Sequence, residues 1–414
     1  MVKAVSSAQD AIALEYQYGA HNYHPLPVVL SRGEGVFLFD VDGKRYYDFL
    51  SAYSAVNQGH CHPAITSAFI RQAQQLTLCS RAFYNDKLGL AEKTVCETFG
   101  YSKSLFMNSG AEANETAIKL ARKWGYTVKG IPDDKAIIIA ARKNFHGRTT
   151  SIISASTDPM ATSGFGPMMP GFKLVDYDNI PELEHALADP NVCGLWIEPI
   201  QGEAGVYVPA PGYLKAAEDL CRKNNVLLMM DEIQTGIGRT GKMLASDHEN
   251  VHADILILGK ALSGGTMPVS CVLSNDEIMG VLHPGEHGST FGGNPLASIV
   301  TIEALRVIHD ECLTENAEIQ GKIFREKMNN LTQKSDLVRL VRGKGLLNAI
   351  VINDTPESET ASNLCISFME NGLLAKPTHG NIIRLAPPLV INTDQIHESA
   401  DIIERCVLNF RKSS

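Results

Sequence analysis

The sequence predicts an α/β fold, with a large domain around a mostly parallel sheet and a smaller α/β lobe formed by the N- and C-terminal segments. Three patterns predict it: an N-terminal hairpin, apolar runs alternating with helical segments, and long helices followed by further strands. A chain of 414 residues with 44% hydrophobic content can build more than one packing unit. We expect an N-terminal segment at 1–50 that packs with the small lobe, a large domain at 51–298 and a small domain at 299–414.

The N-terminal half supplies the hairpin and the first strands. Residues 36–49 alternate apolar and polar side chains around Asp42-Gly43, which predicts two antiparallel strands joined by a tight turn. Helical segments at 64–76 and 111–124 follow. Short apolar runs between and beyond these helices predict parallel strands at 104–107, 136–140, 192–197, 226–230 and 255–258.

The pattern changes after Asn294. One or two long helices are expected up to about Lys334, followed by strands and a terminal amphipathic helix. The strands are expected near 337–341, 346–352 and 382–385. This order predicts a second, smaller α/β lobe.

Composition narrows the class of protein. A net charge of −9 and a pI near 5.8 give no general attraction for nucleic acid or for an anionic membrane. The apolar runs are too short to span a bilayer, and no signal-peptide core opens the chain. Nine cysteines without paired spacing indicate reduced thiols. We expect a cytoplasmic protein, or one of the mitochondrial matrix if a transit peptide has been removed.

Chemically suggestive residues follow several predicted strands, where open α/β sheets bind ligands. Ser109-Gly110 joins a strand to a helix, and the helix N–H groups together with the Ser109 hydroxyl could bind an anion. An ordinary helix start is the more frequent meaning of that pattern alone. The loop 287–295 is rich in Gly and hydroxyls, so Ser289 or Thr290 could contact a phosphate; an unremarkable surface loop is as common.

An acid and a lysine end the next two strands. Asp231 follows an apolar run and could keep a pyridine nitrogen protonated, although a capping or solvated acid is commoner. Lys260 follows a strand that ends at Gly259, where desolvation would lower the pKa of an amine nucleophile. A lysine that extends to the surface is the alternative. Together with the anion site, these residues could hold an aldehyde cofactor that carries a phosphate and a pyridine ring.

Two other motifs compete with this interpretation. Gly236-Ile-Gly238-Arg-Thr-Gly241 matches the dinucleotide fingerprint of an oxidoreductase, but the polar segment after it is too short for the required helix. His60-Cys61-His62 could suggest a metal, yet no second ligand cluster with zinc spacing accompanies it. We expect no metal site. A catalytically silent binding protein stays possible, and only turnover would separate it from an enzyme.

The chain resembles the class III, fold-type I aminotransferases, and above all the members that use ornithine. The segments that carry the resemblance are YGAHNYHPLP at 18–27, DFLSAYSAVNQGHCHP at 48–63, EPIQGEAGV at 198–206, DEIQTG at 231–236 and LGKALSGG at 258–265. The resemblance implies that 51–298 binds pyridoxal 5'-phosphate. It also implies a homodimer or higher oligomer with shared active sites.

The resemblance assigns cofactor roles to individual residues. Lys260 would be the Schiff-base lysine, Asp231 would pair with the pyridine nitrogen, and Gln234 would approach the ring hydroxyl. Phe145 would stack on the ring. The phosphate would be held by Gly110 and Ala111 with Ser109 nearby, and by Thr290, next to Ser289, from the partner subunit.

The resemblance also assigns substrate roles. Arg148 would clamp the α-carboxylate through its bidentate guanidinium. Tyr23 and Tyr53 would surround the substrate. Glu203 and Arg384 would form an ion pair that is closed for ornithine and opens for 2-oxoglutarate. N-acetylornithine and 4-aminobutyrate are the alternative amino donors.

Overall fold

The computed structural model describes residues 7–411. Its largest sheet has seven strands in the order β4-β10-β9-β8-β7-β5-β6. All neighbouring strands are parallel except the two pairs made by β10. The strands are β4 (Lys103–Met107), β5 (Ile137–Ala141), β6 (Phe172–Val175), β7 (Val192–Ile197), β8 (Leu227–Asp231), β9 (Ile255–Leu258) and β10 (Ser270–Ser274). The expected mostly parallel sheet is therefore confirmed.

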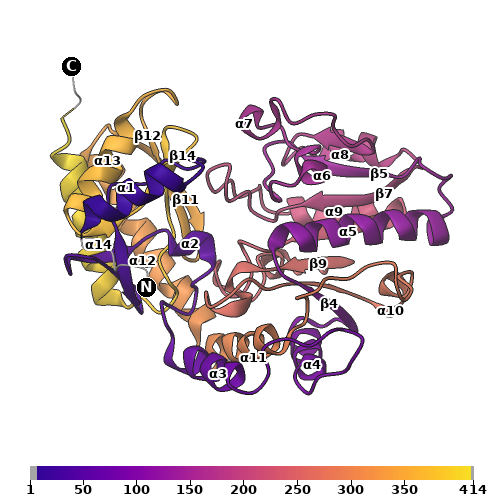
Figure 1. The fold of residues 1–414 in the computed structure, drawn as a ribbon. Coiled ribbons are helices and arrows are strands. Elements are labelled where there is room, and N and C mark those ends of the chain that lie inside the picture. The colour runs from indigo at the N-terminus through magenta and orange to yellow at the C-terminus, as the bar shows by residue number, and fades with distance from the viewer. Residues whose placement is uncertain (1–6, 412–414) are drawn as a thin grey trace.

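Helices cover both faces of this sheet. Along β5, Ile138 packs on the face that carries α5 (Gly110–Trp124), whereas Ile139 packs on the face that carries α8 (Ile180–Leu187) and α9 (Tyr213–Lys223). This alternation follows from the two-residue period of a strand, and burial on both faces explains why β7 and β9 are continuous apolar runs. Figure 1 shows α5, α8 and α9 around this sheet in one lobe.

The second lobe joins the two ends of the chain. One of its sheets has the order β11-β12-β15-β14, and another has β1-β2-β3-β13. The second sheet pairs the N-terminal hairpin with a C-terminal strand. The strands are β1 (Leu30–Glu34), β2 (Phe37–Asp40), β3 (Arg45–Asp48), β11 (Val338–Lys344), β12 (Leu347–Ile352), β13 (Leu373–Leu374), β14 (Lys376–Thr378) and β15 (Ile382–Leu385).

The remaining helices surround these sheets. The expected long helices are α11 and α12, and the terminal helix is α14; Figure 1 shows α12, α13 and α14 together in the second lobe. No helix among residues 7–411 is long and apolar enough to cross a membrane. The α-helices are α1 (Ala8–Tyr18), α2 (Ser51–Ser54), α3 (Pro63–Ala73), α4 (Leu88–Phe99), α6 (Thr150–Ile153), α7 (Pro159–Thr162), α10 (Asp276–Met279), α11 (Pro295–Asp310), α12 (Leu313–Lys334), α13 (Thr360–Glu370) and α14 (Thr393–Leu408). The shorter helical turns are η1 (Gly125–Lys129), η2 (Ser246–Glu249) and η3 (Lys260–Ser263).

Candidate active site

One edge of the large sheet holds the carboxyl ends of β4, β5, β7, β8 and β9. Strands β5, β7, β8 and β9 run parallel, and β4 shares their direction because β10 is antiparallel to both β4 and β9. The residues placed at this edge are Gly110, Phe145, Glu198, Asp231 and Lys260. All five line one cavity of about 200 Å³.

Lys260 enters this cavity directly after a strand whose four residues are all buried. Its backbone has a φ of 44°, in the left-handed region, where it begins η3. Burial lowers the pKa of the Lys260 amine below its usual value, and the Arg384 cation lowers it further. Glu203 and Asp231 oppose that shift. The site therefore favours a neutral amine at lower pH than water does, which suits a nucleophile.

Asp231 is held by a buried network that the sequence did not reveal. The Asp231 carboxylate is 4% exposed and accepts from the backbone N–H of Ile233 at 3.0 Å. Its other oxygen accepts from Asn114 Nδ2 at 3.0 Å and lies 2.7 Å from His146 Nδ1. The His146 ring stacks on Trp196 with centroids 3.8 Å apart, and Trp196 Nε1 donates to Asn114 Oδ1 at 2.9 Å.

The surroundings of His146 define its hydrogen bonding. Nδ1 faces the Asp231 carboxylate, so it carries a hydrogen and donates it. Nε2 is buried and has no hydrogen-bond partner among residues 7–411. The position of His146 next to Phe145 was the only sequence signal of this role.

The start of α5 has backbone donors where the sequence predicts an anion site. Ser109 caps the helix, with its hydroxyl accepting from the N–H of Glu112 at 3.2 Å in a capping box. The N–H groups of Gly110 and Ala111 have no carbonyl one turn earlier to bind, so they are donors at the positive end of the helix. A cavity of about 360 Å³ brings Ser109 and Gly110 together with Lys260.

Glu203 and Arg384 form a closed ion pair. Arg384 Nη1 lies 2.7 Å from Glu203 Oε1, and Gln234 Nε2 donates to the same oxygen at 3.0 Å. Burial would raise the pKa of Glu203, but the Arg384 and Lys260 cations and these hydrogen bonds bring it below its usual value. The Arg384 guanidinium lies over the Tyr53 ring, 4.9 Å from its centroid. Gln234 Oε1 is buried and accepts no hydrogen bond from any of residues 7–411.

Glu198 is a second carboxyl that the strand pattern could have identified, since it directly follows β7. It accepts from the N–H of Phe145 at 3.0 Å. Burial, and then the negative charge of Asp231, raise the pKa of Glu198 well above its usual value. Glu198 is therefore harder to ionise than an exposed glutamate.

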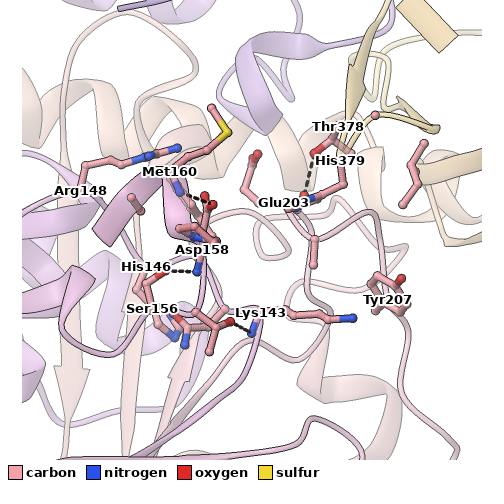
Figure 2. A pocket seen from close by; sticks show the side chains of 18 of the residues that line it. Lys143, His146, Arg148, Ser156, Asp158, Met160, Glu203, Tyr207, Thr378 and His379 are labelled. Atoms are coloured by element: carbon pink, nitrogen blue, oxygen red, sulfur yellow. Dashed lines mark hydrogen bonds between the residues drawn. The ribbon is translucent and has the colours of Figure 1, made fainter. Parts of the chain in front are cut away.

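A larger cavity of about 680 Å³ adjoins the first and shares Phe145 and Glu203 with it. Figure 2 shows Arg148 on one side of this larger cavity and Glu203 on the other. The Arg148 guanidinium lies over the Phe145 ring, 5.6 Å from its centroid. Arg148 is thus within reach of the small cavity that contains Lys260.

Five predicted residues lie outside these cavities. Two of them, Arg384 and Tyr53, join the site because Arg384 binds Glu203 and the Tyr53 ring lies on the Arg384 guanidinium. The Tyr23 side chain is 72% exposed, although its phenol is close enough to influence the pKa of Tyr53. Ser289 accepts from Asn108 Nδ2 at 2.7 Å, one residue before the helix cap. Thr290 is exposed. One chain therefore gathers the predicted site except for Tyr23, Ser289 and Thr290.

The competing motifs have structural roles. The segment 236–241 forms buried turns and is followed by the short turn η2, without the helix that a dinucleotide site needs. Within it, Arg239 is fully buried and donates to the carbonyls of Leu346 and Pro387. His60 and His62 bind separate carboxylates, at Asp48 and Glu311 respectively, and so do not share a ligand.

Comparisons with known proteins agree with this geometry. The family described as aminotransferase class-III matches residues 18–407. The mitochondrial ornithine aminotransferase of Drosophila ananassae is 59% identical over 98% of this chain and 93% of its own. The ornithine aminotransferase structure from Toxoplasma gondii has a TM-score of 0.96 at 48% identity, covering 98% and 96% of the two chains. An acetylornithine aminotransferase from Elizabethkingia anophelis has a TM-score of 0.91 at 56% identity, covering 98% and 100%. This chain belongs to the class-III aminotransferase family.

Proposed function

We propose that this protein is an ornithine δ-aminotransferase that uses pyridoxal 5'-phosphate. It transfers the δ-amino group of L-ornithine to 2-oxoglutarate, giving glutamate and glutamate 5-semialdehyde, which cyclises to pyrroline-5-carboxylate. One observation carries the proposal: Lys260 and Asp231 line one small cavity that also contains one side of the Glu203–Arg384 pair. The relatives named ornithine aminotransferase support the choice of substrate.

The residues around the small cavity fit the cofactor. The start of α5 suits a phosphate and Asp231 suits a protonated pyridine nitrogen. Gln234 Oε1 is buried without a hydrogen-bond partner among residues 7–411, and a ring hydroxyl would supply one. A Cβ at Gly110 would lie 2.9 Å from Ile233 Cδ1, so a side chain there would displace Ile233, which lines the cavity. Phe145 lines the same cavity and can cover a ring face.

The chain's residues then divide the work of amino transfer. Pyridoxal phosphate, when bound, supplies an aldehyde that condenses with amines and a ring that accepts electrons. Lys260 would hold that aldehyde at rest, and its amine, once free, would take the proton from the ornithine δ-carbon. Asp231 would keep the pyridine nitrogen protonated, and His146 and Asn114 hold the Asp231 carboxylate in its orientation.

Ornithine and 2-oxoglutarate can share the site because Glu203 can neutralise the Arg384 cation. With Glu203 bound to Arg384, the Arg384 cation is neutralised and does not repel the ornithine amine, and Arg148 remains to bind the α-carboxylate. When 2-oxoglutarate enters, Arg384 releases Glu203 and binds a carboxylate. Tyr53, and Tyr23 beside it, complete this part of the pocket.

A second candidate is N-acetylornithine. The relative from Elizabethkingia anophelis carries that name, and the cavity of about 680 Å³ beside Arg148 has room for an acyl group on the α-nitrogen. The transferred amine would be the same. Only the group that reaches the outer cavity differs between the two donors, so relative turnover decides between them.

The assembly and the domain division are parts of the same proposal. We propose a homodimer in which the exposed Thr290 of one subunit, next to Ser289, completes the phosphate site of the other. The large domain spans 51–298 and is completed by the segments 1–50 and 299–414. The compartment is the cytoplasm or the mitochondrial matrix, since the relatives from Drosophila and rat are named mitochondrial.

Steady-state assays test the substrate. The holoenzyme is assayed with 2-oxoglutarate and, in turn, ornithine, N-acetylornithine and 4-aminobutyrate. We expect the largest kcat/KM for ornithine, with pyrroline-5-carboxylate as the product. A larger kcat/KM for N-acetylornithine would replace ornithine by the second candidate.

A lysine variant tests the catalytic assignment. Lys260→Ala removes both the covalent anchor and the base, and the base alone is worth roughly 10²- to 10⁴-fold in rate. We expect almost no turnover and no absorbance band that borohydride bleaches. Lys129→Met is the matched control, because burial also lowers the pKa of Lys129, which donates to the carbonyls of Val192 and Asn224. Parent-like turnover by Lys260→Ala would refute the proposal.

A further inference from the structure

A left-handed turn of four residues stands beside the site. Ser51, Ala52, Tyr53 and Ser54 have φ values of 49°, 45°, 60° and 74°, and none of them is glycine. Side chains crowd the backbone in this region, so left-handed residues normally occur singly and are mostly Gly or Asn. Such a run persists only where the surrounding structure imposes it, and conformations of this kind cluster at functional sites.

The surrounding contacts that impose the turn lie on the small lobe. The N–H groups of Leu50 and Ser51 both donate to Asp48 Oδ1 at 2.8 Å. The Ser51 hydroxyl donates to the carbonyl of Ala386 at 2.7 Å, just beyond β15. The N–H of Ala386 in turn donates to the carbonyl of Phe49 at 2.8 Å. The turn is therefore fixed to the segment that follows Arg384.

The turn presents one side chain to the site. Tyr53 is partly buried, and its ring lies over the Arg384 guanidinium, 4.9 Å from the ring centroid. Arg384 is the residue that Glu203 holds at 2.7 Å. In contrast, Ala52 is exposed. Its backbone conformation matters to the direction of Tyr53, whereas its methyl group contributes little packing.

We propose that the left-handed turn Ser51–Ser54 is a positioning element that holds the Tyr53 ring against Arg384 and thereby keeps the Glu203–Arg384 pair closed for an amine-bearing donor. This inference rests on the proposed function and deepens it. Ser51 and Ala52 act through Tyr53 and touch no reacting atom. A ring fixed on the guanidinium face limits the directions in which Arg384 can leave Glu203. Cation–π attraction adds to the closed arrangement.

Two substitutions at Ala52 separate conformational strain from rigidity. Glycine removes the strain and also gives the turn access to other conformations, whereas asparagine tolerates the left-handed region but keeps the restriction of a side chain. Ala52→Gly should lower the ratio of kcat/KM for ornithine to that for 2-oxoglutarate, which needs the open pair, by about tenfold, the scale of a small misplacement in a site. Ala52→Asn should keep the ratio of the parent.

A structural readout accompanies the kinetics. The protein is labelled with 3-fluorotyrosine and studied by ¹⁹F NMR without cofactor, with the Tyr53 resonance assigned through Tyr53→Phe. We expect one sharp Tyr53 line in the parent and in Ala52→Asn, and a shifted or broadened line in Ala52→Gly. Ala73→Gly, at an exposed position in the right-handed helix α3, is the control and should change neither the line nor the ratio.

The outcomes separate this inference from the proposed function. A Tyr53 line and a selectivity ratio that are both unchanged in Ala52→Gly would overturn the positioning role. A changed line with an unchanged ratio would also overturn it, because the turn would then orient Tyr53 without affecting selection. If the parent does not use ornithine, the proposed function fails in the parent assay itself, before any variant is compared.

Discussion

Replacing Glu203 by Gln should leave the Arg384 cation without the carboxylate that neutralises it, so that Arg384 can bind a substrate carboxylate. Glutamine keeps the size of the side chain and can still accept from Arg384, but it no longer neutralises the charge. Arg384 then keeps a contact of 3.3 Å with the carbonyl of Gly202 and the face of the Tyr53 ring. A substrate that places a carboxylate beside Arg384 should gain in kcat/KM, and ornithine should lose.

The size of the effect follows from the geometry. Two unit charges 4 Å apart at an effective dielectric constant of 20 interact by about 4 kcal/mol. The side chain of Arg384 is 5% exposed and that of Glu203 is 24% exposed, so water reaches one partner of the pair. Halving the interaction for this exposure leaves about 2 kcal/mol, which is roughly a 30-fold change in relative kcat/KM.

The assay compares kcat/KM for 2-oxoglutarate, whose carboxylate Arg384 binds, with that for ornithine, in the parent and in Glu203→Gln. Melting temperatures of the two proteins establish that the variant is folded. Glu97→Gln removes one partner of the exposed pair Lys93–Glu97 and is the control for a simple loss of charge. A ratio in Glu203→Gln within about twofold of the parent, a difference below 0.5 kcal/mol, would refute the role of Glu203 in neutralising Arg384.

Two further predictions concern the carboxyl groups. His146→Phe keeps a ring on Trp196 but removes the hydrogen bond to the buried Asp231 carboxylate, which is worth about 1.5–3 kcal/mol. We expect kcat to fall roughly 10- to 150-fold and pyridoxal phosphate to be retained more weakly. Unchanged kcat and unchanged retention would contradict the role of His146. Glu198 has a raised pKa in the folded chain, so folding takes up a proton and stability falls as pH rises from the usual glutamate pKa towards the folded value. Glu198→Gln should remove this pH-dependent loss of stability. The melting temperature of Glu198→Gln minus that of the parent should therefore increase with pH across that range. A constant difference would argue against a raised pKa of Glu198.

The strands of the large sheet could be predicted because burial on both faces leaves a continuous apolar signal. The segments 192–197 and 255–258 match β7 and β9, and β8 is shifted by one residue so that Asp231 ends it. Strands β6 and β10 were not predicted: Lys173 interrupts the apolar run of β6, and serines occupy both ends of β10. Ser270 and Ser274 are nonetheless buried, since their hydroxyls donate to the carbonyls of Ser109 and Asp254. A polar residue with a specific buried partner cannot be recognised from hydropathy.

The candidate site also contains some residues that the sequence could predict and others that it could not. Lys260 and Asp231 could be found because each follows an apolar strand, and the carboxyl ends of such strands meet at one edge. The network of His146, Asn114 and Trp196 could not be found, because its members lie on three elements that are distant in sequence. Family resemblance supplied Glu203 and Arg384, whose contact joins the two lobes and leaves no local pattern.

The charges of the site also explain why one acid can influence both substrate choice and proton transfer. Glu203 raises the pKa of Lys260, whereas Arg384 lowers it, and the two are bound to each other. Replacing Glu203 by a neutral residue removes the opposing charge and leaves Arg384 in place, so the pKa of Lys260 should fall further. The acid limb of a pH profile for kcat, which reports the substrate complex in which the Lys260 amine is free, should then move to lower pH in Glu203→Gln. A selectivity change without this movement would mean that Glu203 acts on Arg384 alone, whereas both changes together would show that one carboxylate couples the recognition of the substrate to the basicity of the lysine.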